Sequence, residues 1–185
     1  KGWSTQANFD EWWQGGPSTK NFWVTVSLTQ DPSTKLWKHT SSNLFYPMKG
    51  MGYDDGTTNG AQRFSIRCFT EFIYTGEEVF NFAGDDDVWV YINRKLVVDL
   101  GGVHGKISAP EVDLDAQASA LGLVKGCRYP MHLFQADRCC CESNFDFSTS
   151  LTPVRPDSAG GICPNSQSSG DICSQDSDCY NNGPT

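Results

Sequence analysis

Three adjacent aspartates, Asp85 to Asp87, stand between two segments that have the composition of buried β-strands. Residues 78–83 before them and residues 88–93 after them are strongly apolar segments of strand length. The two-residue period of a strand places Val88, Val90 and Ile92 on one face, which we expect in the core. A further strand over 96–99 predicts a hairpin whose tight turn lies at Asn93-Arg94.

Period-two alternation bounded by Gly, Asp, Asn and Pro recurs along the chain, whereas helical periodicity is weak. The predicted strands cover 22–28, 63–69, 78–83, 88–93, 96–99, 129–134 and 144–149. Seven short strands predict an all-β protein, either a sandwich or a barrel of antiparallel strands. One short helix is expected over 116–121, with Asp115 as its N-cap and Gly122 at its end.

The composition changes at Thr152 to Pro, Ser, Gly, Asp, Asn and Cys without a hydrophobic pattern. We therefore predict a main domain over 1–153 and, over 154–185, a disulfide-stapled tail or the start of a small second module.

The eight cysteines are an even number, which favours disulfides and an oxidising, extracellular compartment. A zinc protein is the alternative, but no CxxC pair accompanies a second pair or a histidine pair at zinc spacing. The pairing stays open. The disulfide candidates are Cys68, Cys127, Cys139, Cys140, Cys141, Cys163, Cys173 and Cys179.

The formal net charge of -8 repels nucleic acid and anionic membranes and favours cations as partners. No apolar run reaches the roughly 18 residues that span a bilayer, and the polar, aromatic start leads us to expect a mature secreted chain. None of the three histidines lies in a catalytic or metal signature, and nucleophile-elbow and phosphate-loop motifs are lacking. We predict no catalytic residues and no enzymatic activity.

The aspartate triplet is a candidate calcium site. Like charges this close repel unless something neutralises them, and calcium takes about six to eight oxygen ligands in flexible geometry. A solvated acidic turn explains the triplet equally well. In 143–148, Asn144 and Asp146 alternate with Phe145 and Phe147, so both oxygen-bearing side chains point away from the core together. An ordinary amphipathic edge strand has the same pattern.

The run FNFAGDDDVWVYINRKLVVDLGGVHG, at 80–105, resembles the signature of fibro-slime domains. These are a branch of the protective-antigen-type β-sandwich found in yeast flocculins, bacterial adhesins and slime-mould extracellular proteins. The resemblance includes 45–48 upstream and 126–129, Phe134, 136–138 and 143–145 downstream, so it covers roughly 44–151.

This resemblance implies a jelly-roll-like sandwich that binds Ca2+. The implied metal ligands are Asp85 and Asp86, joined by a cis peptide bond, with Asn144 and Asp146 from a second loop. In sugar-binding members, two vicinal hydroxyls of a terminal sugar complete the shell of the ion. The residues expected to line the ligand side are Asp87, His104, Arg138 and Glu142.

One departure from the family is the run Cys139-Cys140-Cys141-Glu142 in a segment that usually carries no cysteines. We expect this loop to border the metal, where it either shapes a ligand pocket or plugs one.

Two functional hypotheses follow. The first is an extracellular, calcium-dependent module that binds a carbohydrate or glycoprotein ligand in adhesion, at a cell surface or in a matrix. The second is a structural building block of an extracellular matrix, wall or appendage filament. In that case neighbouring subunits are the partners and calcium merely stabilises a loop.

Overall fold

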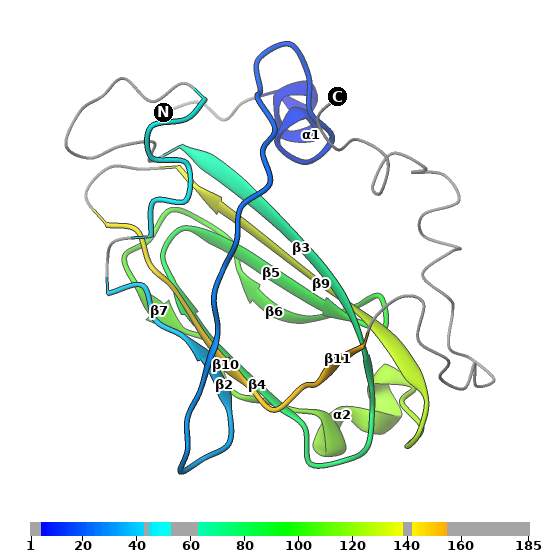
Figure 1. The fold of residues 1–185 in the computed structure, drawn as a ribbon. Helices are drawn as coiled ribbons and strands as arrows, with labels where there is room; N and C mark the ends of the chain where they lie inside the picture. The colour runs from blue at the N-terminus through cyan, green and yellow to red at the C-terminus, as the bar shows by residue number, and fades with distance from the viewer. Residues whose placement is uncertain (1–4, 43–44, 53–62, 139–141, 155–185) are drawn as a thin grey trace.

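A computed structural model describes residues 5–42, 45–52, 63–138 and 142–154. They form two antiparallel sheets packed face to face, so the predicted β-sandwich is confirmed (Figure 1). The β4 sheet has the order β1 (Thr29–Gln30), β2 (Trp37–His39), β10 (Phe145–Thr149), β4 (Val79–Gly84) and β7 (Ile107–Ser108), and β8 (Val112–Asp113) also pairs with β4. The β9 sheet has the order β11 (Pro153–Val154), β3 (Phe64–Ile73), β9 (Arg128–Asp137), β5 (Asp87–Ile92) and β6 (Lys95–Leu100).

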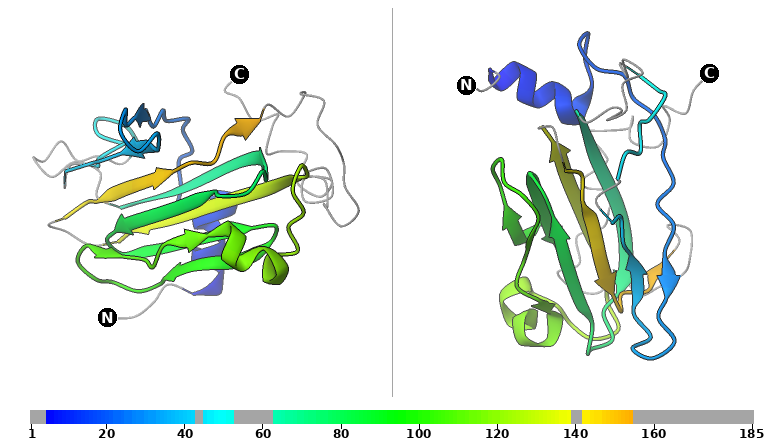
Figure 2. Two further views of the ribbon diagram at one scale, coloured as in Figure 1. Left: turned by 90° about the horizontal axis from the view of Figure 1, so that it is seen from below. Right: turned by 90° about the vertical axis from the view of Figure 1, so that its left-hand side faces the viewer.

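Two helices lie at opposite ends of the sandwich (Figures 1 and 2). They are α1 (Gln6–Gln14) and α2 (Leu114–Leu121). Within the described ranges, neither is long and apolar enough to cross a membrane.

The core lies between the sheets and follows the predicted alternation. Val88, Val90 and Ile92 of β5 are completely buried, and Phe80 and Phe82 of β4 are nearly so. Their removal from water is the main source of stability for a sandwich of this kind.

The hairpin between β5 and β6 turns where the sequence predicts. Asn93 and Arg94 both have positive φ angles, 47° and 63°, as a two-residue turn of type I′ requires. The Asn93 side chain also donates to the carbonyl of Leu121, at 2.7 Å, which ties the turn to α2.

Three local predictions are wrong. Residues 22–28 form no strand; Phe22 and Trp23 there are 43% and 74% exposed, and strand pairing begins only at Thr29. Helix α2 begins at Leu114 with Asp113 as its N-cap, because the Asp113 side chain accepts the N–H of Ala116. Asp115 therefore lies inside the first turn, although Gly122 ends the helix as expected.

Helix α1 was not predicted. It begins after Thr5, whose side chain accepts the N–H of Asn8, and it ends at Gly15. Its periodicity is too weak to identify in the sequence, and its aromatic residues become an apolar face only against the sheet that they contact.

The other strand predictions are confirmed, and β3 and β9 extend beyond their expected ends. Residues 153–154 pair with β3, so the sandwich reaches the predicted domain boundary. The tail from 155 lies outside the described residues, and the two-part division of the chain stays a prediction.

Candidate functional site

The three aspartates occupy the turn from β4 into β5. All are buried, with exposed fractions of 3%, 4% and 2% for Asp85, Asp86 and Asp87. Asp86 turns the chain in the left-handed region, with φ at 54°. The peptide bonds of the described residues are all trans, so the cis bond implied between Asp85 and Asp86 is not present. The three side chains reach different partners.

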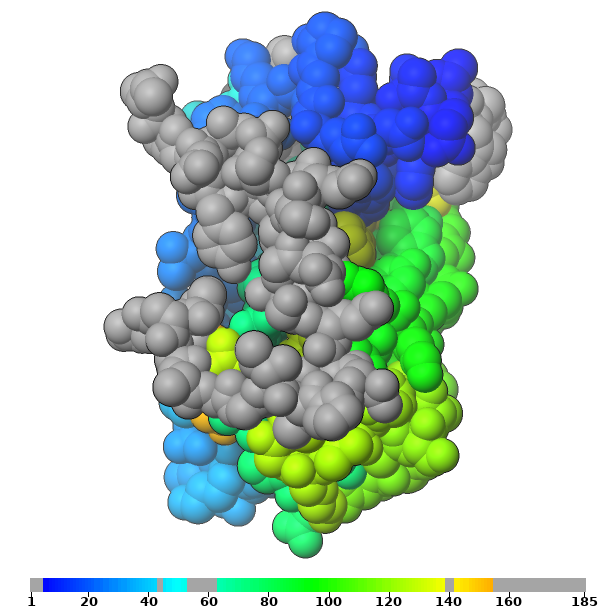
Figure 3. Space-filling view, turned by 90° about the vertical axis from the view of Figure 1, so that its right-hand side faces the viewer, coloured from blue at the N-terminus to red at the C-terminus, as the bar shows by residue number. Residues whose placement is uncertain are grey.

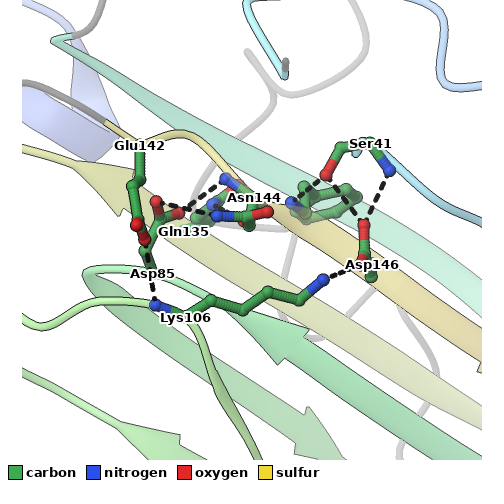
Figure 4. A network of polar contacts seen from close by, with 8 residues as sticks. Ser41, Asp85, Lys106, Gln135, Glu142, Asn144 and Asp146 are labelled. Carbon is green, nitrogen blue, oxygen red and sulfur yellow. Dashed lines mark hydrogen bonds and ion pairs between the residues drawn. The ribbon is translucent and has the colours of Figure 1, made fainter. Parts of the chain in front are cut away.

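Asp85 meets Asn144 at the end of the β4 sheet (Figure 4). Its Oδ1 accepts the backbone N–H of Asn144 at 2.7 Å, and its Oδ2 accepts the side-chain Nδ2 at 3.3 Å. The pairing of Gly84 with Phe145 brings the two residues together. A Cβ on Gly84 would lie 2.9 Å from the Asn144 carbonyl oxygen, so this close approach requires glycine.

Asp86 fastens two other segments to the turn. Its carboxylate accepts the N–H of Arg138 at 2.6 Å and that of His104 at 3.3 Å, and its own N–H donates to the His104 carbonyl. The His104 ring nitrogens lie 2.9 Å and 3.1 Å from the carbonyl oxygens of Gly105 and Leu100. In this structure His104 therefore holds its own loop against Asp86.

Asp87 points to the outer face of the β9 sheet. It accepts the N–H of Gly102 at 2.7 Å and forms an ion pair with the Arg138 guanidinium. That guanidinium also lies over the ring of Trp12, 5.9 Å from its centroid. Asp87 and Arg138 thus neutralise each other beside α1.

Asp146 is also neutralised within the chain. It accepts the N–H and the hydroxyl of Ser41, at 2.6 Å and 2.7 Å, and its other oxygen pairs with the Lys106 ammonium. Burial alone would raise its pKa, but Lys106 and Ser41 outweigh burial and the pKa is lowered. The N–H of Lys106 donates to Glu142, at 3.4 Å, so Glu142 lies along the same loop.

Asp85 differs from these carboxylates. Its partners among the described residues are amide N–H groups, and no Lys, Arg or His pairs with it. Burial raises the pKa of Asp85 and the nearby charge of Asp86 adds to the increase, while the hydrogen bonds from Asn144 oppose it. A buried carboxylate in this state needs a proton or a cation.

Gln135 is a residue of the site that the sequence analysis missed. It is completely buried on the inner face of β9, and its Nε2 donates to the Asn144 carbonyl at 3.2 Å. Its buried Oε1 has no hydrogen-bond partner among the residues that the structure describes. A signal existed, because Gln135 continues the inward row of Met131 and Leu133 with a polar residue.

These residues fit a calcium ion in their chemistry. Asp85 and Asp86 offer carboxylate oxygens, and the amide of Asn144 would present its oxygen after a 180° flip. The Oε1 of Gln135, which no described residue contacts through a hydrogen bond, adds a buried acceptor. Within the described ranges, no three His, Cys, Asp or Glu side chains cluster as a metal site, so neutral oxygens would complete the shell.

The predicted disulfide of Cys68 is contradicted, because its thiol is free and exposed on β3. Its partner in the ladder is Leu133, so no cysteine lies opposite. Cys127 is completely buried and disulfide-bonded, as predicted for it, and its partner lies outside the described residues. The other six cysteines lie outside the described residues, and their further disulfides stay a prediction.

The profile of the PA14 domain matches residues 48–162. The chain belongs to the PA14 domain family. This family, related to anthrax protective antigen, consists of β-sandwiches of lectin and adhesin type, in agreement with the sheets described above. The PA14 match includes the aspartate turn, β9, β10 and Asn144, whereas α1 lies before it.

Curated relatives of this PA14 domain come from Dictyostelium discoideum. Protein psiR is 34% identical over 96% of the chain, protein psiB 37% over 86%, and protein psiI 37% over 72%. The chain spans only 18%, 29% and 19% of the length of these three proteins. No solved structure matches. Membership of the family favours a carbohydrate-binding or adhesion module.

Proposed function

We propose that this PA14 domain is an extracellular, calcium-dependent module that binds a carbohydrate or glycoconjugate in adhesion. The observation that carries the proposal is Asp85, a buried carboxylate with a raised pKa and no cationic side chain beside it in the described part of the chain. A calcium ion supplies the missing charge, and it offers coordination positions to vicinal sugar hydroxyls when bound.

The proposed ligands are Asp85, Asp86 and Asn144. The two carboxylates lie on one turn and Asn144 comes from the neighbouring strand, so the fold holds them before any ion binds. Gln135 orients Asn144 through its carbonyl. Asp146 is left out of this set, because Lys106 already neutralises it.

The ligand side of the site consists of the segments that Asp86 holds. His104 and Arg138 donate their backbone N–H groups to Asp86 and thereby fix the edges of the corner. Glu142 lies beside the same loop through its bond to Lys106. The proposal includes secretion, disulfides in the cysteine-rich segments, membership of the fibro-slime branch and the absence of enzymatic activity.

Calorimetry with calcium and a glycan array with and without chelator test this function. We expect Asp85→Asn to lower calcium affinity at least about a hundredfold, since the charged oxygen is lost, and to abolish glycan signal. The matched control is Glu111→Gln, which removes one negative charge at an exposed residue bonded to Asn81 and should change neither readout.

An unmodified protein that binds no calcium would refute the proposal. Calcium binding with higher thermal stability, but without glycan signal, would instead favour the structural building block.

A further inference from the structure

We propose that a groove beneath α1 is a second sugar subsite, which holds the apolar face of the ring next to the one at the Asp85–Asp86 corner. This inference rests on the proposed function and extends it to oligosaccharides. The groove has a volume of about 330 Å³, at the small end of the range for ligand pockets. Its lining residues are Phe9, Trp12, Asp87, Trp89, Gly101 and Gly102.

One wall of the groove is fixed in place by α1. Trp13 packs edge-on against Phe134 of β9 and Trp89 of β5, with centroid distances of 5.3 Å and 6.2 Å. The hydroxyl of Ser65 on β3 donates to the carbonyl of Trp12. Figure 3 shows the N-terminal segment, in dark blue, next to the green surface of the hairpin strands. Since α1 lies before the PA14 match, the helical wall of the groove lies outside the region that the family profile matches.

The chemistry of the groove suits an uncharged ring. Phe9, Trp12 and Trp89 are only partly buried and present aromatic surface, on which the C–H face of a pyranose stacks. The one carboxylate in the lining, Asp87, is paired with Arg138. Trp12 already has the Arg138 guanidinium over its ring, so the groove offers little to a second cation.

The glycines keep the groove open. A Cβ on Gly101 would lie 3.4 Å from two atoms of the Trp89 indole, and 3.3 Å from an oxygen of Asp99. A larger side chain there would cover the indole. Gly102 has φ at 123°, where other residues are strained, and its N–H binds Asp87.

The groove and the Asp85–Asp86 corner share one wall. Asp86 and Asp87 are consecutive, and Arg138 contacts the first through its N–H and the second through its guanidinium. The loop after β6 repeats this arrangement, with Gly102 on Asp87 and His104 on Asp86. A ligand at the corner therefore extends directly into the groove with its next sugar unit.

The test compares monosaccharides with disaccharides. The probes are methyl glycosides of glucose, galactose and mannose and the corresponding disaccharides, titrated calorimetrically with calcium present. We expect the best disaccharide to bind about tenfold more tightly than its methyl glycoside, as one stacked ring contributes. Gly101→Val fills the groove and Phe9→Ala removes one wall, and both should bring this ratio close to one while calcium and monosaccharide affinities stay unchanged.

The matched control is Phe22→Ala, which removes an exposed phenylalanine outside the groove and should keep the ratio. Thermal unfolding checks that each variant is folded; two groove variants are used so that one folding failure does not decide the test. A ratio that survives both variants, or no gain for any disaccharide despite calcium-dependent monosaccharide binding, overturns the inference alone. Absence of all calcium-dependent sugar binding overturns the proposed function and the subsite with it.

Discussion

Asp85 and Asp146 are two carboxylates near the start of β10 that have different partners within the chain (Figure 4). Asp85 and Asp146 both accept a backbone N–H, from Asn144 and from Ser41. Asp146 also has the Lys106 ammonium, and its pKa is lowered. Asp85 has only amide donors among the described residues, and burial raises its pKa. The chain thus supplies a cation to Asp146 and, among the described residues, none to Asp85.

The largest expected effect is a change in the free energy of unfolding that has opposite signs at Asp85 and Asp146. Without calcium, Asp85→Asn should raise the free energy of unfolding by about 1–2 kcal/mol, because it removes a buried charge that has no cation. Asp146→Asn should lower it by about 1 kcal/mol, because it leaves Lys106 without its partner. Urea denaturation in chelator measures both values. If both variants change the free energy of unfolding in the same direction, Asp85 and Asp146 are in equivalent electrostatic environments. The argument for an external cation at Asp85 then fails.

A smaller effect is expected when the internal cation is removed. Lys106→Met should cost about 0.5–1 kcal/mol, a value reduced by solvent screening because the Lys106 side chain is 40% exposed. The double variant with Asp146→Asn should regain most of the lost free energy of unfolding. A double-mutant cycle by urea denaturation measures this gain. The comparison also predicts that millimolar calcium partly stabilises Lys106→Met, since Asp146 then resembles Asp85. If the double variant is no more stable than Lys106→Met, Lys106 acts by packing rather than by charge.

The smallest effect concerns a third carboxylate, Asp115, whose shortest hydrogen bond comes from a neutral hydroxyl, while the Lys125 ammonium lies 3.7 Å away. The hydrogen bond from Tyr74, at 2.5 Å, lowers the pKa of Asp115 and raises that of Tyr74 to about 12. A pKa raised in the folded state contributes stability below the ordinary tyrosine pKa of about 10, and this contribution is lost as the pH rises towards the folded value.

Thermal unfolding measured between about pH 9 and about pH 12 should therefore show that the protein loses stability as the pH rises. The loss should be smaller in Tyr74→Phe. The control is Tyr91→Phe, on the outer face of β5. An equal alkaline loss in Tyr74→Phe would contradict the assignment. The proposed effect of calcium should be the same in both tyrosine variants, because, among the described residues, Asp115 shares no hydrogen-bond partner with Asp85 or Asp86.

Much of the fold could be predicted from local patterns. The apolar face of β5 and the turn at Asn93-Arg94 depend on residues adjacent in sequence, so alternation and turn chemistry identify them. Residues 22–28 have the alternation of a strand but form none, because alternation without a pairing partner does not make a strand. Helix α1 could not be predicted from alternation or periodicity, because its apolar side exists only where Trp13 meets Phe134.

The candidate site could be predicted only in part. The pairing of β4 with β10 unites Asp85 with Asn144, as the resemblance implies. Neither the pattern nor the resemblance revealed that Lys106 neutralises Asp146, that Arg138 neutralises Asp87, or that Gln135 lies behind Asn144. Lys106 and Asp146 are 40 residues apart, and even Gln135 and Asn144, which are 9 residues apart, meet only through the register of neighbouring strands.

The sequence by itself determined the all-β class, the β5–β6 hairpin and the PA14 family, since each is encoded in a continuous run of residues. Only the tertiary structure decided which acidic side chains near the site receive a cation from the chain, as Asp87 and Asp146 do, and where α1 encloses a groove. The physical reason is that backbone conformation follows near neighbours, whereas the balance of buried charge depends on side chains that meet across strands.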